Sequence, residues 1–258
     1  MSVMTATAKR SALLAAASTV TRPRVNLVAN RLLASLPSRD RALLRDDVEQ
    51  VKLETWQVLE TPTQPISHVY FPVSGLVSVV GTSGDEQRIE VGMVGYEGMS
   101  GLALVLGHDR SSNETVVQAD GEAIRLPRAS LRRAMRASPT LSSTFLRYVH
   151  TFMMQASQTA LANGRARLTQ RLARWLLMWH DRLRTPHLTV THRFLALLLG
   201  VRRQGVTLAL HELEGQGLIR GTRNLVTILD RDGLQALAGD FYGVAEAEYE
   251  AMMRMRQR

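Results

Sequence analysis

The feature that most constrains the fold is a pair of apolar, helix-patterned segments separated by the polar sequence GVRRQG. In the first segment, apolar side chains recur three and four residues apart behind Thr191, a residue type that caps helix N-termini. That pattern stops at Gly200, and a second predicted helix runs from about Arg202 to Gly215. The sequence LIRGTRNLVTIL then predicts a strand, a turn and a second strand. The order helix, short turn, helix, hairpin is that of a winged helix-turn-helix.

The second helix of such a motif enters the DNA major groove by its N-terminal end. That end needs long hydrogen-bond donors, because base edges and phosphates offer acceptors there. Arg202, Arg203 and Gln204 lie in the first turn, and Thr207 and His211 follow on the predicted exposed side. A bare arginine pair more often marks a solvated helix start. The surrounding motif shifts the balance toward DNA contact.

The charge of the chain is consistent with a polyanionic partner. Lys and Arg number 32 against 23 Asp and Glu, and all but Lys9 and Lys52 of these cations are arginines. Arginine presents a planar fork that fits phosphate and guanine edges. Between 165 and 223 eleven arginines face three acidic residues, and Arg220 and Arg223 flank the hairpin turn. Charge alone would also suit an anionic membrane, but no apolar run approaches the ~20 residues of a membrane span.

Several chemistries are excluded or unsupported by composition. The chain has no Cys, which excludes disulfides, Cys-ligated zinc, iron–sulfur clusters and a cysteine nucleophile. Its seven histidines show no HxxxH or HExxH spacing, so no metal site is predicted. No catalytic motif has a recognisable local context, and we expect no enzymatic activity.

Upstream of the motif the texture changes twice. Two short helices interrupted by Pro37 are predicted between Asn26 and Val51, and β-rich runs with regular turn signals fill 56–126, as in an antiparallel barrel or jelly roll. After Pro139 a long helix is predicted, followed by another over 165–184. The apolar seam of the long helix consists of Leu141, Phe145, Tyr148 and Phe152. That seam predicts pairing with a second copy, the alternative being a helix that packs only on its own β-domain.

The sequence LTVTHRFLALLLGVRRQGVTLALHELEGQGLIRGTRNLVTILDRDGL resembles the Crp/Fnr family of bacterial transcription regulators, in a subgroup with a GVRR-x-GVT recognition helix. The resemblance covers roughly 25–243. It implies an α+β fold with an N-terminal, jelly-roll-like antiparallel β-roll sensor, a long dimerisation helix and a C-terminal winged helix-turn-helix. The expected divisions are a flexible tail (1–24), the β-roll (25–137), the dimerisation helix (138–163), the DNA-binding domain (164–243) and a C-terminal tail (244–258).

The resemblance also implies roles and partners. Arg203 and Gln204 take base-reading positions, Arg202 the helix-start position and Thr207 a phosphate contact. The resemblance implies a cytoplasmic homodimer that reads a near-palindromic operator. The candidate partners are double-stranded DNA, a second copy of the chain, RNA polymerase and an unknown small-molecule effector. No membrane partner is expected. Whether it activates or represses stays open. The alternative is a ligand-binding regulatory module that acts through an acidic protein partner without binding DNA.

The sensor half departs from the cyclic-nucleotide-binding members of the family. Those members carry a Gly-Glu pair for the ribose and an Arg-Ser or Arg-Thr pair for the cyclic phosphate. In EGMSGLALVLGHDRSSNETVV, Ser100 and Gly101 stand where the Glu is expected, while Arg110 and Ser111 could still meet a phosphate. These four residues form the candidate effector pocket. Without the carboxylate we expect no cyclic nucleotide and no other cofactor.

Overall fold

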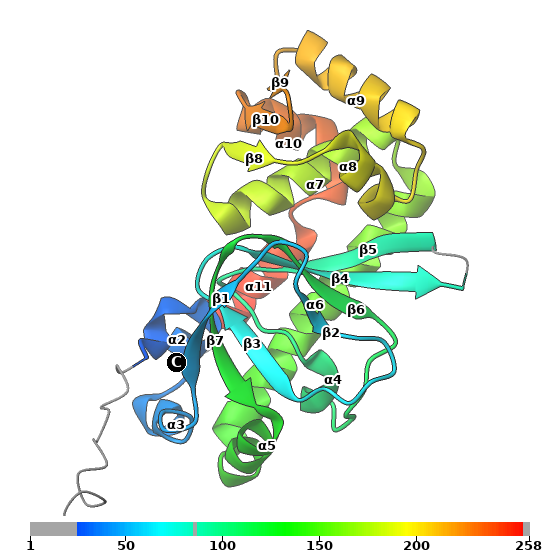
Figure 1. Ribbon diagram of the computed structural model, residues 1–258. Helices are drawn as coiled ribbons and strands as arrows, with labels where there is room; N and C mark the ends of the chain where they lie inside the picture. Colours follow the sequence, from blue (N-terminus) through cyan, green and yellow to red (C-terminus); the bar gives the residue numbers. More distant parts are fainter. Residues whose placement is uncertain (1–24, 85–86, 255–258) are drawn as a thin grey trace, which may run out of the picture.

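The computed structural model describes residues 25–84 and 87–254 (Figure 1). The predicted tail at 1–24 and residues 255–258 lie outside the described residues. The fold class is the predicted one: antiparallel sheets in the N-terminal half are followed by a long helix and a helix-turn-helix domain. None of the described helices combines the length and the apolar character needed to cross a membrane.

The β-roll consists of two antiparallel sheets. One has the strand order β1-β7-β3, comprising Glu49–Leu53, Gly121–Pro127 and His68–Pro72. The other has the order β2-β6-β4-β5, comprising Val58–Glu60, Glu114–Ala119, Leu76–Ser83 and Gln87–Val94. Apolar residues that are buried on both sheets, such as Phe71, Val77 and Ile124, form its interior. Because aromatic content is low, Val, Leu and Ile supply most of this packing, as expected from the sequence.

Short helices close the roll at its edges. They are η1 (Leu27–Ala29), α2 (Arg31–Ser35), α3 (Ser38–Ala42), α4 (Leu102–Val105) and α5 (Arg128–Ala137). Pro37 ends one predicted helix and precedes the next, since it stands as the N-cap of α3. The long helix α6 (Pro139–Arg165) then begins with Pro139 in its first turn and with Ser138 as its cap, whose hydroxyl accepts from the Leu141 N–H at 3.1 Å.

The C-terminal half is a winged helix-turn-helix. It comprises α7 (Leu168–Leu183), β8 (His187–Thr189), α8 (His192–Leu199), α9 (Arg203–Gly215), β9 (Ile219–Thr222), β10 (Leu225–Ile228) and α10 (Arg231–Ala238). The predicted signals operate as expected: the Thr191 hydroxyl caps α8 by accepting from the Phe194 N–H at 3.2 Å, and Gly200 ends it with φ of 61°. The hairpin also pairs with β8 in the order β8-β10-β9, a strand that the sequence patterns did not predict.

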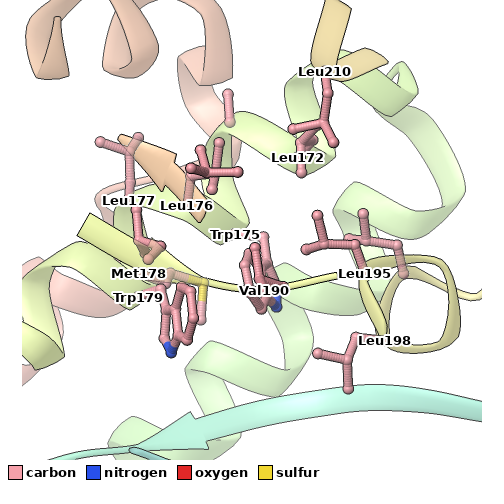
Figure 2. Close-up of a cluster of buried hydrophobic side chains, with 14 of the residues drawn as sticks. Leu172, Trp175, Leu176, Leu177, Met178, Trp179, Val190, Leu195, Leu198 and Leu210 are labelled. Atoms are coloured by element: carbon pink, nitrogen blue, oxygen red, sulfur yellow. The ribbon is translucent and has the colours of Figure 1, made fainter. Parts of the chain in front are cut away.

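One hydrophobic core joins the two halves. Figure 2 shows Leu172, Trp175 and Leu176 of α7 meeting Leu195 of α8 and Leu210 of α9. The same cluster continues into the β-roll through four buried residues, which are Leu76, Val80, Met93 and Val116. The helix-turn-helix domain therefore packs on the β4–β5 side of the roll.

The apolar seam of α6 faces inward, so its prediction as the dimer contact is wrong. Leu141 and Phe145 are fully buried, and Tyr148 and Phe152 are nearly so, all within the protomer's own core. Phe145 packs on Phe71 of β3 with ring centroids 5.9 Å apart. Periodicity identified a buried face of the helix, but it could not tell whether the β-roll or a second copy covers it.

The predicted C-terminal tail is also corrected up to residue 254. After η2 (Gly239–Phe241) the chain forms α11 (Val244–Arg254), which packs along α6. Tyr249 and Met252 are buried there, and Glu250 forms a two-pronged ion pair with Arg31 at 2.6 and 2.9 Å. After the helix-turn-helix domain the chain thus returns to the N-terminal half and packs against it.

Candidate nucleic-acid interface

The N-terminal end of α9 carries an exposed polar cluster. Arg202 is the N-cap residue in an extended conformation, and the side chains of Arg202, Arg203 and Gln204 are all exposed. Within the described part of the chain, no carboxylate lies in ion-pair range of either arginine. The cluster faces outward because the opposite side of the helix is buried by Val206 and Leu213. The predicted donors are therefore free to reach a polyanion.

Gly205 has a packing reason. A Cβ at this position would lie 3.1 Å from Leu168 Cδ2, at the start of α7. The absence of a side chain at Gly205 lets the start of α7 approach α9 closely.

Thr207 has a different surrounding from the one predicted. Its hydroxyl donates to the carbonyl oxygen of Arg203 at 3.1 Å and lies 2.9 Å from Nδ1 of His192. A hydroxyl has one proton, so the ring nitrogen of His192 is then the donor of the second bond. These contacts fasten α8 to α9, and a phosphate contact would have to compete with them. His192 was not singled out in the sequence.

The wing completes a basic groove next to α9. Arg220 and Arg223 are exposed on the β9–β10 hairpin, whose turn places Asn224 at φ of 59°. The hairpin is held to α9 by the Glu214 carboxylate, which accepts from the Gly221 N–H at 2.9 Å. Between hairpin and helix lies a groove of about 600 Å³. Its charged or titratable lining residues are His192, Arg193, Arg203, His211 and Arg223, together with one acid, Glu214. The structure thus brings Arg203, His211 and Arg223 together, and adds Arg193.

One exposed residue of α9 escaped the sequence patterns. Leu208 is 70% exposed, on the same outward side as Gln204 and His211. Because α9 contains several leucines, Leu208 is recognised as exposed only when its position around the helix axis is compared with the positions of Val206 and Leu213. That comparison would have placed it outside the buried face.

The four residues of the candidate effector pocket do not share a cavity of this kind. Ser100 and Gly101 are buried, the Gly101 N–H donates to Oε1 of Glu60 at 2.6 Å, and the Tyr70 N–H donates to Oγ of Ser100 at 3.1 Å. Burial raises the pKa of the Glu60 carboxyl, and hydrogen bonds from Ser100 and Gly101 oppose that rise. Glu60, a residue the sequence patterns passed over, thus occupies the donors at this position.

The other pair lies at the surface. Arg110 is about half exposed and donates to the Thr63 carbonyl at 2.7 Å, while the Ser111 hydroxyl accepts from the Asn113 N–H at 3.0 Å. A separate cavity of about 220 Å³ lies between α6, α7 and α11, and none of the four residues lines it. The structure therefore uses these residues in local contacts.

A buried acid links the sensor to the DNA-binding domain. Glu90 of β5 accepts hydrogen bonds from Trp175 Nε1 of α7 at 3.0 Å, from Gln118 Nε2 at 2.6 Å and from the Ser78 hydroxyl. Desolvation raises the pKa of its carboxyl to about 7, although the hydrogen bonds and Arg174 pull it the other way. A second bridge, from loop to helix, is the edge-to-face contact of Trp56 with Phe194 at 4.7 Å.

Two family models match the chain in the order seen in the fold. Residues 50–138 match the cyclic nucleotide-binding domain, and residues 170–237 match the Crp-like helix-turn-helix domain. The comparison with curated proteins found no match. None of the matches supports a regulatory module without a DNA-binding domain.

Solved structures with the same architecture are similar at low sequence identity. A protein from Eubacterium rectale described as a Crp/Fnr-family regulator is 18% identical, with 82% of this chain and 99% of that chain covered at a TM-score of 0.66. FixK2 from Bradyrhizobium japonicum is 19% identical over 74% and 98% of the chains, with a TM-score of 0.65. TTHB099, a CRP-family transcriptional regulator from Thermus thermophilus, is 20% identical over 74% and 97%, with a TM-score of 0.60.

The two matched domains and the shared architecture define the class of protein: a transcriptional regulator with a helix-turn-helix DNA-binding domain behind a cyclic-nucleotide-binding-type β-roll. These are the two domains of Crp/Fnr-type transcriptional regulators, and the solved structures that share the fold are described as regulators of that kind.

Proposed function

We propose that the protein is a homodimeric regulator that reads a near-palindromic operator with the N-terminal end of α9. The observation that carries the proposal is the exposed, unpaired cluster of Arg202, Arg203 and Gln204, beside the arginine-lined groove of the wing. Long donors at this end of a recognition helix suit base edges and phosphates. The proposal places the protein in the cytoplasm, where its DNA lies, and it assigns no catalytic activity.

The two arginines have different tasks in this proposal. Arg203 is the first residue of α9 and borders the groove, so its fork suits the O6 and N7 acceptors of a guanine. Arg202 precedes the helix and suits a phosphate, which positions the protein without reading sequence. Arg220 and Arg223 of the wing extend the phosphate contacts.

A different face of α6 from the one predicted supports the dimer. Its exposed stripe runs at alternating four- and three-residue steps through six positions, which are Leu146, His150, Met153, Ser157, Ala160 and Gly164. This is the spacing of a coiled-coil seam, and its three last residues are small enough for close helix approach. Leu146 is 45% exposed and Met153 is 58% exposed. Two large apolar side chains exposed on the same helix face are typical of a surface that a second helix covers.

We extend the proposal to the effector: a partner other than a cyclic nucleotide acts on the β-roll, and RNA polymerase is the further protein partner. Supporting this, the Gly101 N–H donates to Glu60, the Ser100 hydroxyl accepts from the Tyr70 N–H, and Arg110 donates to the Thr63 carbonyl. Calorimetry should therefore detect no cyclic AMP binding in the micromolar range. Saturable micromolar binding would contradict the effector proposal and leave the DNA-binding proposal intact.

The test of the proposed function is selection of binding sites from random double-stranded DNA with the full-length protein. We expect enrichment of a near-palindrome whose half-sites are ~10 base pairs apart, since two recognition helices of a dimer meet successive turns of the groove. Failure of any sequence to enrich, at a salt concentration where non-specific binding is detectable, would refute the proposal.

A further inference from the structure

Leu208 is the most exposed of the large hydrophobic side chains that the structure describes, at 70%. It lies in the middle of α9, whose other leucines are buried: Leu210 is 7% exposed and Leu213 is fully buried. Exposing an aliphatic side chain to water has no benefit for folding, and a polar residue at this position would cost nothing. The side chain is therefore available for contact with a partner outside the protomer, on the helix that the proposed function places in the major groove.

The surroundings of Leu208 define that contact. On a helix, residues three and four apart share a face, so Leu208 lies between Gln204 and His211 on the exposed side. Glu212 next to it is exposed as well. One apolar side chain framed by polar ones does not form the hydrophobic patch that a protein partner needs. It fits a surface that is polar except at a single point.

Major-groove DNA is such a surface. Its base edges present hydrogen-bond donors and acceptors, with the thymine 5-methyl group as the apolar feature. A leucine side chain makes no hydrogen bond, so the thymine methyl group is the base-edge feature whose contact with leucine favours binding, because both apolar groups leave water. Figure 1 shows α9 at the outer rim of the DNA-binding domain, away from the β-roll.

We infer that Leu208 contacts a thymine methyl group in each half-site and makes thymine the preferred base there. The inference rests on the proposed function, because it needs α9 in the major groove. It adds a specificity-determining residue to the donors at the helix start. Because Leu208 lies more than one turn after Arg203, its thymine should be separate from the base pair that Arg203 contacts.

The experiment replaces, one at a time, each thymine of the selected operator by deoxyuridine, which removes only the methyl group. Wild-type protein should lose about fourfold in affinity at one position per half-site, and about fifteenfold when both symmetric positions are changed, as expected for one buried methyl-sized group. Leu208→Ala should bind the thymine and uracil operators equally. Leu208→Met, which keeps an apolar contact, should retain most of the preference.

Leu106→Ala is the matched control, since Leu106 is 61% exposed but directly follows α4 in the β-roll, outside α9. It should show the wild-type preference for thymine. The inference is overturned if wild type tolerates uracil at every position, or if Leu208→Ala keeps the full preference. In both of these cases an operator has been selected, so the proposed function survives. If no operator can be selected, both are refuted.

Discussion

Glu90 is a carboxylic acid enclosed where the sensor meets the DNA-binding domain. Three donors from three elements, Ser78, Gln118 and Trp175, converge on its two oxygens. Removing a charged carboxylate from water is costly, which is why its pKa rises to about 7 despite those donors. Near neutral pH this residue is therefore partly protonated in the folded protein.

The stability of the protein should depend on pH through this residue. Between pH ~4.5 and ~7 the folded state holds a proton on Glu90 that the unfolded chain releases. The free energy of unfolding therefore decreases as the pH rises through this range, by up to ~3 kcal/mol from Glu90. Urea unfolding of wild type and Glu90→Gln at pH 5 and pH 8 measures this. The variant should lose less stability over that interval. Equal losses would show that Glu90 does not titrate there.

At the level of elements, many helices and strands followed from local signals, whereas β8 and α11 did not. Thr191, Gly200 and Pro37 act as the cap, the stop and the break that their chemistry predicts. Local signals did not predict which element packs against each helix face. The seam of α6 and the return of α11 depend on partners distant in sequence, and periodicity alone cannot identify them.

The site was predictable to a similar extent. The position of Arg203 at the start of a helix is a local property, so the sequence carries it. The engagement of Thr207 by His192, and that of Gly101 by Glu60, each joins residues from different elements. Such contacts are set by tertiary packing, and no spacing rule contains them.

The exposed stripe of α6 gives a prediction for assembly. Met153→Asp places a charge at the centre of the proposed coiled-coil seam, where a dimer would have to desolvate it, so the protein should become monomeric at micromolar concentration. Sedimentation analysis measures the mass. Leu106→Asp changes a leucine that is 61% exposed but lies outside the stripe of α6, and this variant should stay dimeric. A dimeric Met153→Asp would remove α6 as the interface.

At the scale of the whole molecule, α11 connects parts that are far apart in the chain. The Tyr249 hydroxyl donates to the carbonyl oxygen of Glu97 at 2.8 Å, and Glu250 pairs with Arg31 of α2. The helix also packs along α6, directly after the DNA-binding domain. Together with the shared core, it fixes the orientation of that domain on the β-roll.

A chain that ends at residue 243 should therefore be less stable. It lacks the buried residues of α11, of which Tyr249 and Met252 have the largest side chains, and exposes the apolar surface that they cover. Removing buried side chains of this kind costs ~3 kcal/mol each, so scanning calorimetry should show a Tm lower by roughly 10 °C or more. A chain that ends at 254 is the control and should melt like the full-length protein. Equal melting of both shortened chains would mean that α11 contributes no stability.

In the proposed function α9 reads bases through Arg203, while Arg202 contacts the DNA backbone. Binding isotherms at several salt concentrations, on selected and scrambled DNA, test it for wild type, Arg203→Ala and Arg202→Ala. Arg203→Ala should weaken binding by ~1–3 kcal/mol on the selected site only, with preference relaxed at one base pair per half-site. Arg202→Ala should weaken binding to both DNAs alike, and it should reduce the salt slope by about one for each phosphate that is no longer neutralised. If Arg203→Ala binds both DNAs as wild type does, α9 does not read the sequence and the account is wrong.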